Sequence, residues 1–152
     1  MTALEAGDLL PDVSLESTDG PVTLHDLLED GSLLILFYQE DSTPLCTTQL
    51  CAFRDDLEML DELDASVVAI SVDDVASHAV FADTYEIPFP LLSDPELAAA
   101  TAFGVVDEAA RRAQRAAFVC DPQGEIVLAI PFYQPVNFEH YQAVFEALGL
   151  DL

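Results

Sequence analysis

Residues 37–55 read FYQEDSTPLCTTQLCAFRD and join the end of an apolar run to the start of a segment with helical spacing. The apolar run, residues 33–38, is short and bounded by turn-forming residues, which predicts a buried central strand. Pro44 is tolerated in the first turn of a helix and Thr43 suits the capping position. We therefore expect one helix over residues 43–63, with an apolar face formed by Leu50, Phe53, Leu57, Leu60 and Leu63.

The remaining segments extend this pattern into an α/β fold. A second apolar run at residues 65–72 predicts another buried strand, and strand–helix–strand order predicts a right-handed parallel crossover. Hairpins are expected around the turns at residues 18–20 and 121–124. Further helices are expected at residues 75–85, 96–103 and 138–148. This order of elements matches a thioredoxin-like sheet, and because no repeat or linker divides the sequence, we expect a single domain over residues 1–152.

The charge of the chain is strongly negative. It has 29 acidic residues against four basic ones, with no lysine, and a formal net charge of -25. Such a surface repels phosphate backbones and anionic lipids, which argues against nucleic-acid and membrane-surface partners. At about 1 M salt the Debye length shrinks to about 3 Å and screens the self-repulsion. The composition therefore favours a halophilic protein over an ordinary acidic one.

The sequence also bears on the cellular compartment. Its apolar runs are far shorter than the roughly 20 residues of a membrane-spanning helix. Residues 1–8 contain neither a basic segment nor an apolar one. We therefore expect no secretory signal and a cytoplasmic protein. Three cysteines, an odd number, do not suit a disulfide framework, so reactive or buried thiols are expected.

Cys46 is the candidate reactive thiol. It falls in the first turn of the expected helix, where free backbone N–H groups and the helix dipole favour an anion. Only the thiolate form of a cysteine is a strong nucleophile. The hydroxyl of Thr43, three residues earlier, can reach groups around this sulfur. The alternative is that Cys46 is simply a small core residue, the commoner role of a lone cysteine.

Cys51 lies five residues after Cys46, and this spacing has a mechanical consequence. In an ideal helix, positions i and i+5 have Cα atoms about 8.6 Å apart and point roughly 140° from each other. A disulfide needs Cα atoms within about 7 Å. If the two thiols form a disulfide, the first turns of the helix must unwind.

The pattern Thr43-Pro44-x-Cys46, followed by Cys51 and by Phe53-Arg54-Asp55, resembles the active-site segment of peroxiredoxins, specifically the peroxiredoxin Q or bacterioferritin comigratory protein subgroup. The resemblance covers nearly the whole chain, with further matches in family order at residues 77–81, 85–95, 103–105 and 115–124. It implies a thioredoxin-like fold with a central mixed β-sheet flanked by helices, an N-terminal β-hairpin and one peroxiredoxin domain over residues 1–152.

The resemblance also implies roles for individual residues. Thr43, Cys46 and Arg115 would form the peroxide site, and Cys51 would be the resolving cysteine. In a chain of charge -25, a guanidinium at Arg115 would compensate the thiolate charge, although Arg115 could instead be a surface arginine like Arg111 and Arg112. The implied reaction reduces hydrogen peroxide and alkyl hydroperoxides without a metal, haem or flavin. A thioredoxin-type dithiol protein would reduce the resulting disulfide, in a monomer or a homodimer.

One residue departs from the family pattern. The family has a proline seven residues before the peroxidatic cysteine, where this chain has Gln39. That proline normally shields the sulfur from one side; Gln39 could pack the stem of its side chain over Cys46 instead, or leave the sulfenic acid more exposed to overoxidation.

The other polar residues are given simpler interpretations. Cys120 lies in an apolar strand segment and is predicted to be a buried core thiol. The histidines show no metal-ligand spacing, and the acidic pairs at residues 55–56 and 73–74 are expected to be solvated surface without a role.

Three alternatives to this mechanism remain. Cys46 could work alone with an external thiol, as in peroxiredoxins that lack a resolving cysteine. Cys46 oxidation could instead serve a non-enzymatic redox sensor or holdase. A thioredoxin-like disulfide reductase is less favoured, because that chemistry uses a Cys-x-x-Cys pair.

Overall fold

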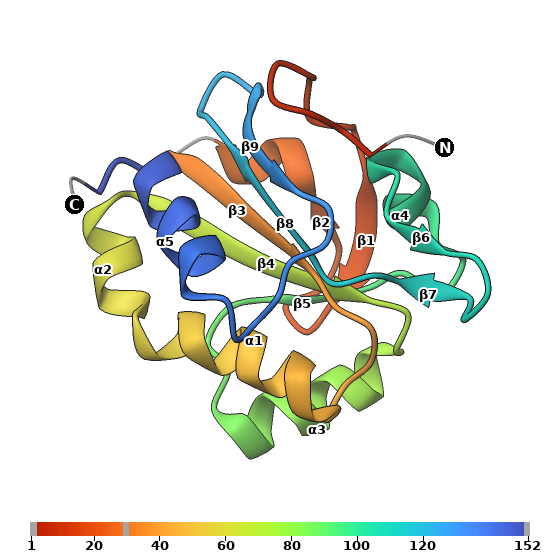
Figure 1. Cartoon of the computed structure of the whole chain (residues 1–152). Helices are drawn as coiled ribbons and strands as arrows, with labels where there is room; N and C mark the ends of the chain where they lie inside the picture. Colours follow the sequence, from red (N-terminus) through yellow and green to blue (C-terminus); the bar gives the residue numbers. More distant parts are fainter. Residues whose placement is uncertain (1–2, 29–30, 151–152) are drawn as a thin grey trace.

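A seven-stranded sheet forms the centre of the protein (Figure 1); the computed structural model describes residues 3–28 and 31–150. The strand order is β2-β1-β5-β4-β3-β8-β9. β3 pairs with β4 in parallel and with β8 in antiparallel orientation, so the sheet is mixed as predicted. The strands are β1 (Ser14–Ser17), β2 (Val22–Thr23), β3 (Ser32–Phe37), β4 (Ala65–Ser71), β5 (Leu91–Ser93), β8 (Ala116–Cys120) and β9 (Ile126–Ile130).

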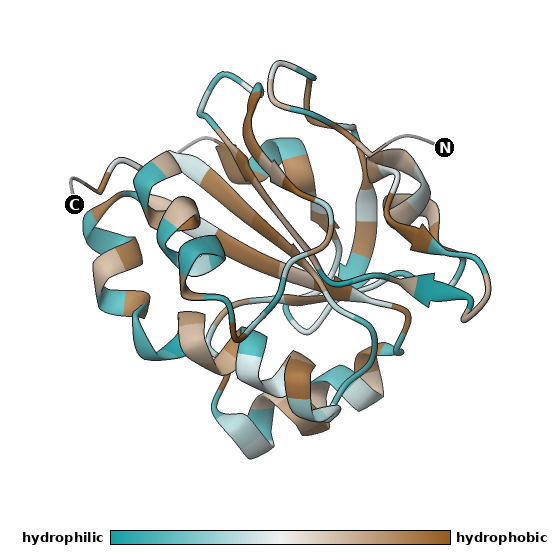
Figure 2. Ribbon diagram, in the orientation of Figure 1, coloured by the Kyte–Doolittle hydropathy of each residue, from teal (hydrophilic) through white to brown (hydrophobic). Residues whose placement is uncertain are grey.

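Both faces of the central strands are buried, which explains why β3 reads as a continuous apolar run. Successive side chains of a strand point to opposite faces, so Leu34 and Leu36 enter one core while Leu33, Ile35 and Phe37 enter the other. Figure 2 shows these strands as the hydrophobic centre of the molecule. The helices α1, α3 and α5 contribute to the first core, and α4 with the short 3-10 helix η1 (Leu24–Leu28) contributes to the second.

The helices are α1 (Pro44–Asp55), α2 (Leu57–Glu62), α3 (Val75–Tyr85), α4 (Ala98–Phe103) and α5 (Phe138–Ala147). The expectation of one helix over residues 43–63 is wrong, because Asp56 interrupts it with φ -107° and ψ 21°. The Tyr141 hydroxyl of α5 donates to the Asp56 carboxylate and holds this non-helical residue in place. Asp56 is half-buried, so the expectation that residues 55–56 are solvated surface is also wrong for this member of the pair.

Thr43 has its predicted position but not its predicted hydrogen bond, whereas both predicted hairpins are confirmed. Thr43 occupies the N-cap of α1, but its hydroxyl donates to the Glu40 carbonyl at 2.9 Å and makes no cap hydrogen bond to the helix. The hairpins around residues 18–20 and 121–124 form as predicted, with β1–β2 and β8–β9 antiparallel.

The sequence patterns missed the shortest elements. β5 has three residues in a proline-rich segment, and β6 (Val106–Asp107) with β7 (Arg112–Ala113) forms a two-stranded sheet of its own. Runs of two or three residues carry too little periodicity to be recognised. Within the described parts of the chain, no helix has the length and apolar character needed to cross a membrane.

Candidate active site

The loop between β3 and α1 places Cys46 in the first turn of α1. The side chain is fully buried, and its Sγ atom accepts a hydrogen bond from the backbone N–H of Gln39 at 3.4 Å. The first N–H groups of a helix have no partner within it, so the thiol lies at a position that favours negative charge. Cys46 thus has the environment of a reactive thiol as well as the burial of a core residue.

Arg115 reaches this site from the segment between β7 and β8. Its Nη1 atom donates to the side-chain oxygen of Gln39 at 3.0 Å, so Gln39 contacts both Cys46 and Arg115. Within the described residues, the Nε atom of Arg115 is buried without a hydrogen-bond partner, which leaves it able to donate. The geometry therefore distinguishes Arg115 from an ordinary surface arginine. The Nε atom of Arg112 is likewise buried without a partner among the described residues, but the Nη1 atom of Arg112 forms an ion pair with Glu40 at 2.7 Å, so the charge of Arg112 is compensated.

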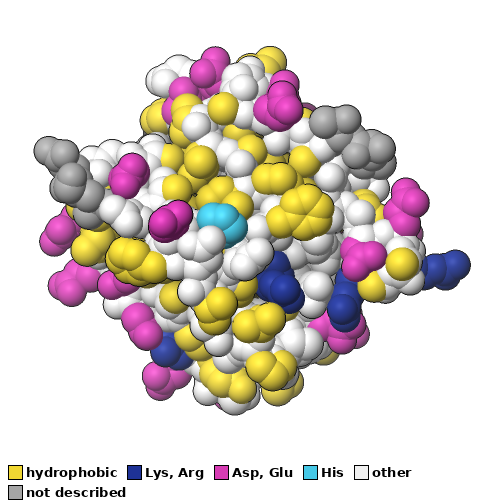
Figure 3. All heavy atoms as spheres, viewed as in Figure 1, with side chains coloured by type: hydrophobic (Ala, Val, Ile, Leu, Met, Phe, Trp, Pro, Cys, Tyr) yellow, Lys and Arg dark blue, Asp and Glu magenta, His cyan; other side chains and the backbone are white. Residues whose placement is uncertain are grey.

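A pocket of about 800 Å³ opens beside these residues, and Gln39, Leu45 and Arg115 contribute to its wall. Phe132 and Val136 also line it and are 68% and 76% exposed. On the face seen in Figure 3, hydrophobic side chains are abundant near the centre, while many acidic ones lie toward the periphery. The pocket thus combines the Arg115 cation and apolar side chains with two carboxylates, Asp107 and Glu108.

Thr43 and Cys51 lie on the same segment but do not contact Cys46 through any hydrogen bond found among the described residues. The Thr43 hydroxyl uses its proton on Glu40, which leaves its oxygen free only to accept. Cys51 is half-buried, and burial raises the pKa of its thiol, partly offset by Arg54. All three cysteines are free thiols, and the intact helix α1 separates Cys46 from Cys51.

The two ends of α1 are attached to the rest of the protein to different degrees. At the C-terminal end, Arg54 donates to the Tyr85 carbonyl at 2.6 Å, and Tyr141 donates to the Ala52 carbonyl at 2.9 Å. At the N-terminal end, the hydroxyls of Thr47 and Thr48 bond back to carbonyls of the same segment. Unwinding of the first turn alone would therefore break few contacts with other elements, but unwinding as far as Gln49 would also break the hydrogen bond from its Nε2 atom to the Phe37 carbonyl at 3.2 Å.

Cys120 is a buried core thiol, as predicted. It is fully buried, and desolvation together with the nearby Asp121 raises its pKa to about 11. Cys120 belongs to the core on one face of the sheet, and Cys46 belongs to the core on the other. The sheet therefore separates the two thiols.

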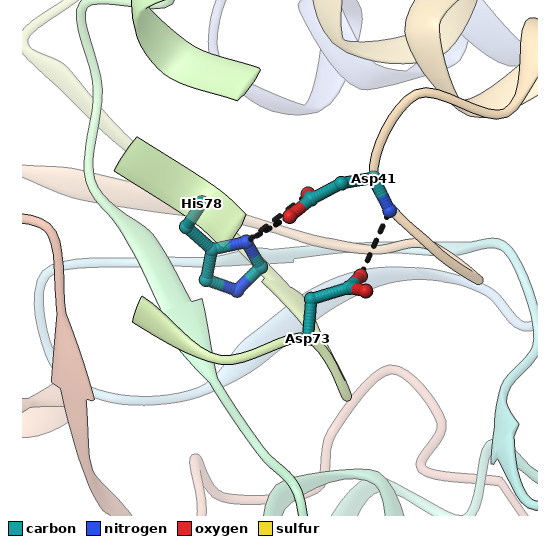
Figure 4. Close-up of side chains that lie close together, drawn as sticks. All are labelled: Asp41, Asp73 and His78. Carbon is teal, nitrogen blue, oxygen red and sulfur yellow. Dashed lines mark hydrogen bonds and ion pairs between the residues drawn. The ribbon is translucent and has the colours of Figure 1, made fainter. Parts of the chain in front are cut away.

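The side chains of Asp41, Asp73 and His78 lie close together (Figure 4). His78 is fully buried, with Nδ1 2.9 Å from an Asp41 carboxylate oxygen and Nε2 3.0 Å from the Leu92 carbonyl. Both ring nitrogens face acceptor oxygens, so the Asp41 carboxylate and the His78 ring form a buried hydrogen-bonded pair. Burial tends to raise the pKa of Asp41, but hydrogen bonds, chiefly from His78, lower it overall.

Asp73 completes this network, since its carboxylate accepts from the Asp41 backbone N–H at 2.8 Å and from the Ser71 hydroxyl at 2.7 Å. The neighbouring Asp74 caps α3 by accepting from the Ser77 N–H at 2.8 Å. The expectation that residues 73–74 have no role is therefore wrong. The three side chains lie close enough for a metal ion, but both carboxylate oxygens of Asp41, both ring nitrogens of His78 and one oxygen of Asp73 are engaged in internal hydrogen bonds that fix the loop. Sequence spacing could not reveal this cluster because its members come from three segments.

Comparison with known proteins agrees with this architecture. The model of the AhpC/TSA family matches residues 6–129. Chloroplastic peroxiredoxin Q from Triticum aestivum is 42% identical over 88 residues, which are 58% of this chain and 41% of that protein, so the match spans under half of its length. Peroxiredoxin Bcp from Bacillus subtilis (strain 168) is 32% identical over 130 residues, 82% of this chain and 83% of that one.

A solved structure extends the similarity to the fold. Peroxidoxin BcpB from Mycobacterium tuberculosis superposes with a TM-score of 0.87 at 32% identity, covering 95% of this chain and 96% of that one. The predicted thioredoxin-like fold with a mixed sheet, flanking helices and an N-terminal hairpin is confirmed. By sequence and by fold, the chain belongs to the AhpC/TSA family, together with relatives named peroxiredoxin Q and Bcp.

Proposed function

We propose that this protein is a thiol peroxidase in which Cys46 is the peroxidatic cysteine. The observation that carries the proposal is the position of the Cys46 sulfur, at the N-terminus of α1 and 3.4 Å from the Gln39 N–H. Helix N-terminal N–H groups and a directed donor stabilise a thiolate. Arg115 lies on the other side of Gln39 and adds a positive charge to the pocket whose wall Gln39 helps to form.

In the proposed reaction, the Cys46 thiolate attacks the terminal oxygen of a hydroperoxide. The S–O bond forms as the O–O bond breaks, and the leaving oxygen takes a proton from solvent to depart as water or an alcohol. Arg115 and free N–H groups of α1 stabilise the negative charge that develops on the oxygens, and the Thr43 hydroxyl joins them by turning its proton from the Glu40 carbonyl toward the peroxide. The exposed apolar surfaces of Phe132 and Val136 fit an alkyl hydroperoxide as well as hydrogen peroxide.

Cys51 is the proposed resolving cysteine. Its thiolate attacks the sulfur of Cys46 sulfenic acid, which releases water and leaves an intramolecular disulfide. Because α1 holds the two residues apart, its first turns must open, and the opening also exposes Cys51 to solvent, which removes the burial that raises its pKa. A thioredoxin-type dithiol protein would then reduce the disulfide by exchange, in the cytoplasm and in a monomer or homodimer.

Peptide mass after oxidation tests this assignment. Trypsin separates the peptide of residues 1–54, which holds Cys46 and Cys51, from the peptide of residues 116–152, which holds Cys120. One equivalent of peroxide should remove two hydrogens from the first peptide without linking it to another. A Cys46–Cys120 bridge, an intermolecular bridge or a persistent sulfenic acid would contradict the role of Cys51.

Turnover distinguishes an enzyme from a redox sensor. Peroxide consumption with thioredoxin, its reductase and NADPH at high salt should be continuous for the native chain. Cys46→Ser should abolish it, and Cys51→Ser should permit one oxidation without recycling by thioredoxin. Recycling of Cys51→Ser by small thiols at the native rate would favour the mechanism with Cys46 alone. Absence of turnover with every thiol donor would refute the peroxidase proposal.

A further inference from the structure

Gln39 makes two contacts that the proline of the family pattern cannot make. Its backbone N–H donates to the Cys46 sulfur at 3.4 Å, and its side-chain oxygen accepts from Arg115 at 3.0 Å. Proline has no backbone N–H and no polar side chain. This chain therefore has a polar link between the sulfur and the guanidinium at a position where the family has a hydrophobic shield.

The neutrality of Gln39 matters because carboxylates are abundant in this chain. Glu40 and Asp41 follow directly in the loop, but Glu40 is paired with Arg112 and Asp41 with His78. The partner of Arg115 is thus an amide oxygen, which orients the guanidinium without neutralising its charge. A carboxylate at the same place would cancel that charge and bring a negative charge close to the thiolate.

We propose that Gln39 is a positioning residue that acts on both reactive groups: its N–H stabilises the Cys46 thiolate, and its side chain holds Arg115 at the peroxide pocket. The inference rests on the proposed role of Cys46. It goes beyond both alternatives, in which Gln39 covers the sulfur or leaves it less shielded, because the residue here supplies a donor and an orienting acceptor.

Three substitutions separate the two contacts. Gln39→Met keeps the N–H and the length of the side chain but removes the oxygen. Gln39→Glu keeps the shape and adds a charge, and Gln39→Pro removes both contacts. Gln123→Met is the matched control, since Gln123 is exposed in the turn between β8 and β9. All are made in a Cys51→Ser background, so that Cys46 is the only cysteine in the peptide of residues 1–54.

Two rates are measured at pH 7. Alkylation of Cys46 by iodoacetamide reports the reactivity of the thiolate, whereas the first oxidation by hydrogen peroxide also requires Arg115 in position. Gln39→Met should slow oxidation about tenfold and alkylation less than about twofold, since it removes a hydrogen bond to a charged group and retains the N–H. Gln39→Pro should slow alkylation at least about threefold and oxidation more than Gln39→Met. Gln39→Glu should slow both, and Gln123→Met should change neither.

The outcomes are distinguishable. If Gln39→Met is oxidised at the same rate as the protein with the native Gln39, the role of the side chain is refuted. If Gln39→Pro is alkylated at the native rate, the role of the N–H is refuted. If Gln39→Pro fails to fold, as judged by circular dichroism, the comparison of Gln39→Met with Gln39→Glu still decides the inference: equal rates for these two would overturn it. If the native chain is alkylated at Cys46 but not oxidised by peroxide, the proposed function itself fails.

Discussion

Asp41→Asn is the most informative test of how the fold supports the reactive loop. The Asp41 carboxylate accepts from the Tyr38 hydroxyl at 2.6 Å, the Ser77 hydroxyl at 2.8 Å and His78 Nδ1 at 2.9 Å. Its side chain is 5% exposed, and that of His78 is fully buried. An asparagine would remove the buried carboxylate that accepts from these three groups and would turn an NH2 group toward one of the donors.

The magnitude follows from this geometry. Removing the charged partner of a buried pair costs about 3–5 kcal/mol, because the group that remains is desolvated without its partner. We expect Asp41→Asn to lower the free energy of unfolding by about 3 kcal/mol or more. The assay is urea denaturation at constant high salt, followed by circular dichroism.

Asp74→Asn is the matched control. Asp74 lies at the exposed N-cap of α3, where asparagine caps about as well as aspartate, so this variant should lose less than about 0.5 kcal/mol. Both variants remove one negative charge, so any relief of the overall repulsion is the same in each. A difference of less than about 1 kcal/mol between the two variants would refute the assignment of a buried hydrogen-bonded pair.

The pH dependence of this difference has a defined sign. The pKa of Asp41 in the folded protein lies below its ordinary value of 3.8. Its stabilising contribution is therefore fully present above pH 3.8 and is lost as the pH falls through the lower folded-state value. The part of the difference that comes from Asp41 ionisation should thus be lost only in acid, as the pH falls below 3.8.

Three further predictions concern charge, dynamics and the peroxide pocket. Unfolding free energy should rise as salt is increased from about 0.1 M to about 1 M, because the Debye length falls from about 10 Å to about 3 Å; a flat or falling dependence in urea titrations would contradict self-repulsion as the dominant effect. On oxidation, the amide hydrogens of residues 46–50 should lose more protection against hydrogen exchange than those of residues 53–55, because the C-terminal end of α1 is bonded to Tyr85 and Tyr141. An equal loss of protection along the helix would show that α1 opens as a whole. Arg115→Lys should slow the first oxidation by about tenfold, since an ammonium lacks the guanidinium's fork of donors, while Arg111→Lys at the exposed position should leave the stopped-flow rate unchanged.

Local sequence patterns predicted the elements whose apolar residues form a clear run or recur at regular spacing. The run at residues 33–38 reads as a buried strand, and β3 is the centre of the sheet with both faces covered. The helix expected at residues 75–85 is confirmed with the same bounds, whereas its capping by Asp74 was not foreseen, because residues 73–74 were given no role. The break at Asp56 was missed, because it depends on a hydroxyl from α5 that no local pattern contains.

The sequence by itself determined the α/β pattern, the acidic character of the chain and the position of Cys46 at the start of a helix, because these depend on composition and on near neighbours along the chain. Only the tertiary structure decided that Gln39 links Cys46 to Arg115 and that Asp41 is bound by His78 and Asp73. Those contacts join residues between 7 and 76 positions apart, and they form only when separate loops and helices converge at one edge of the sheet.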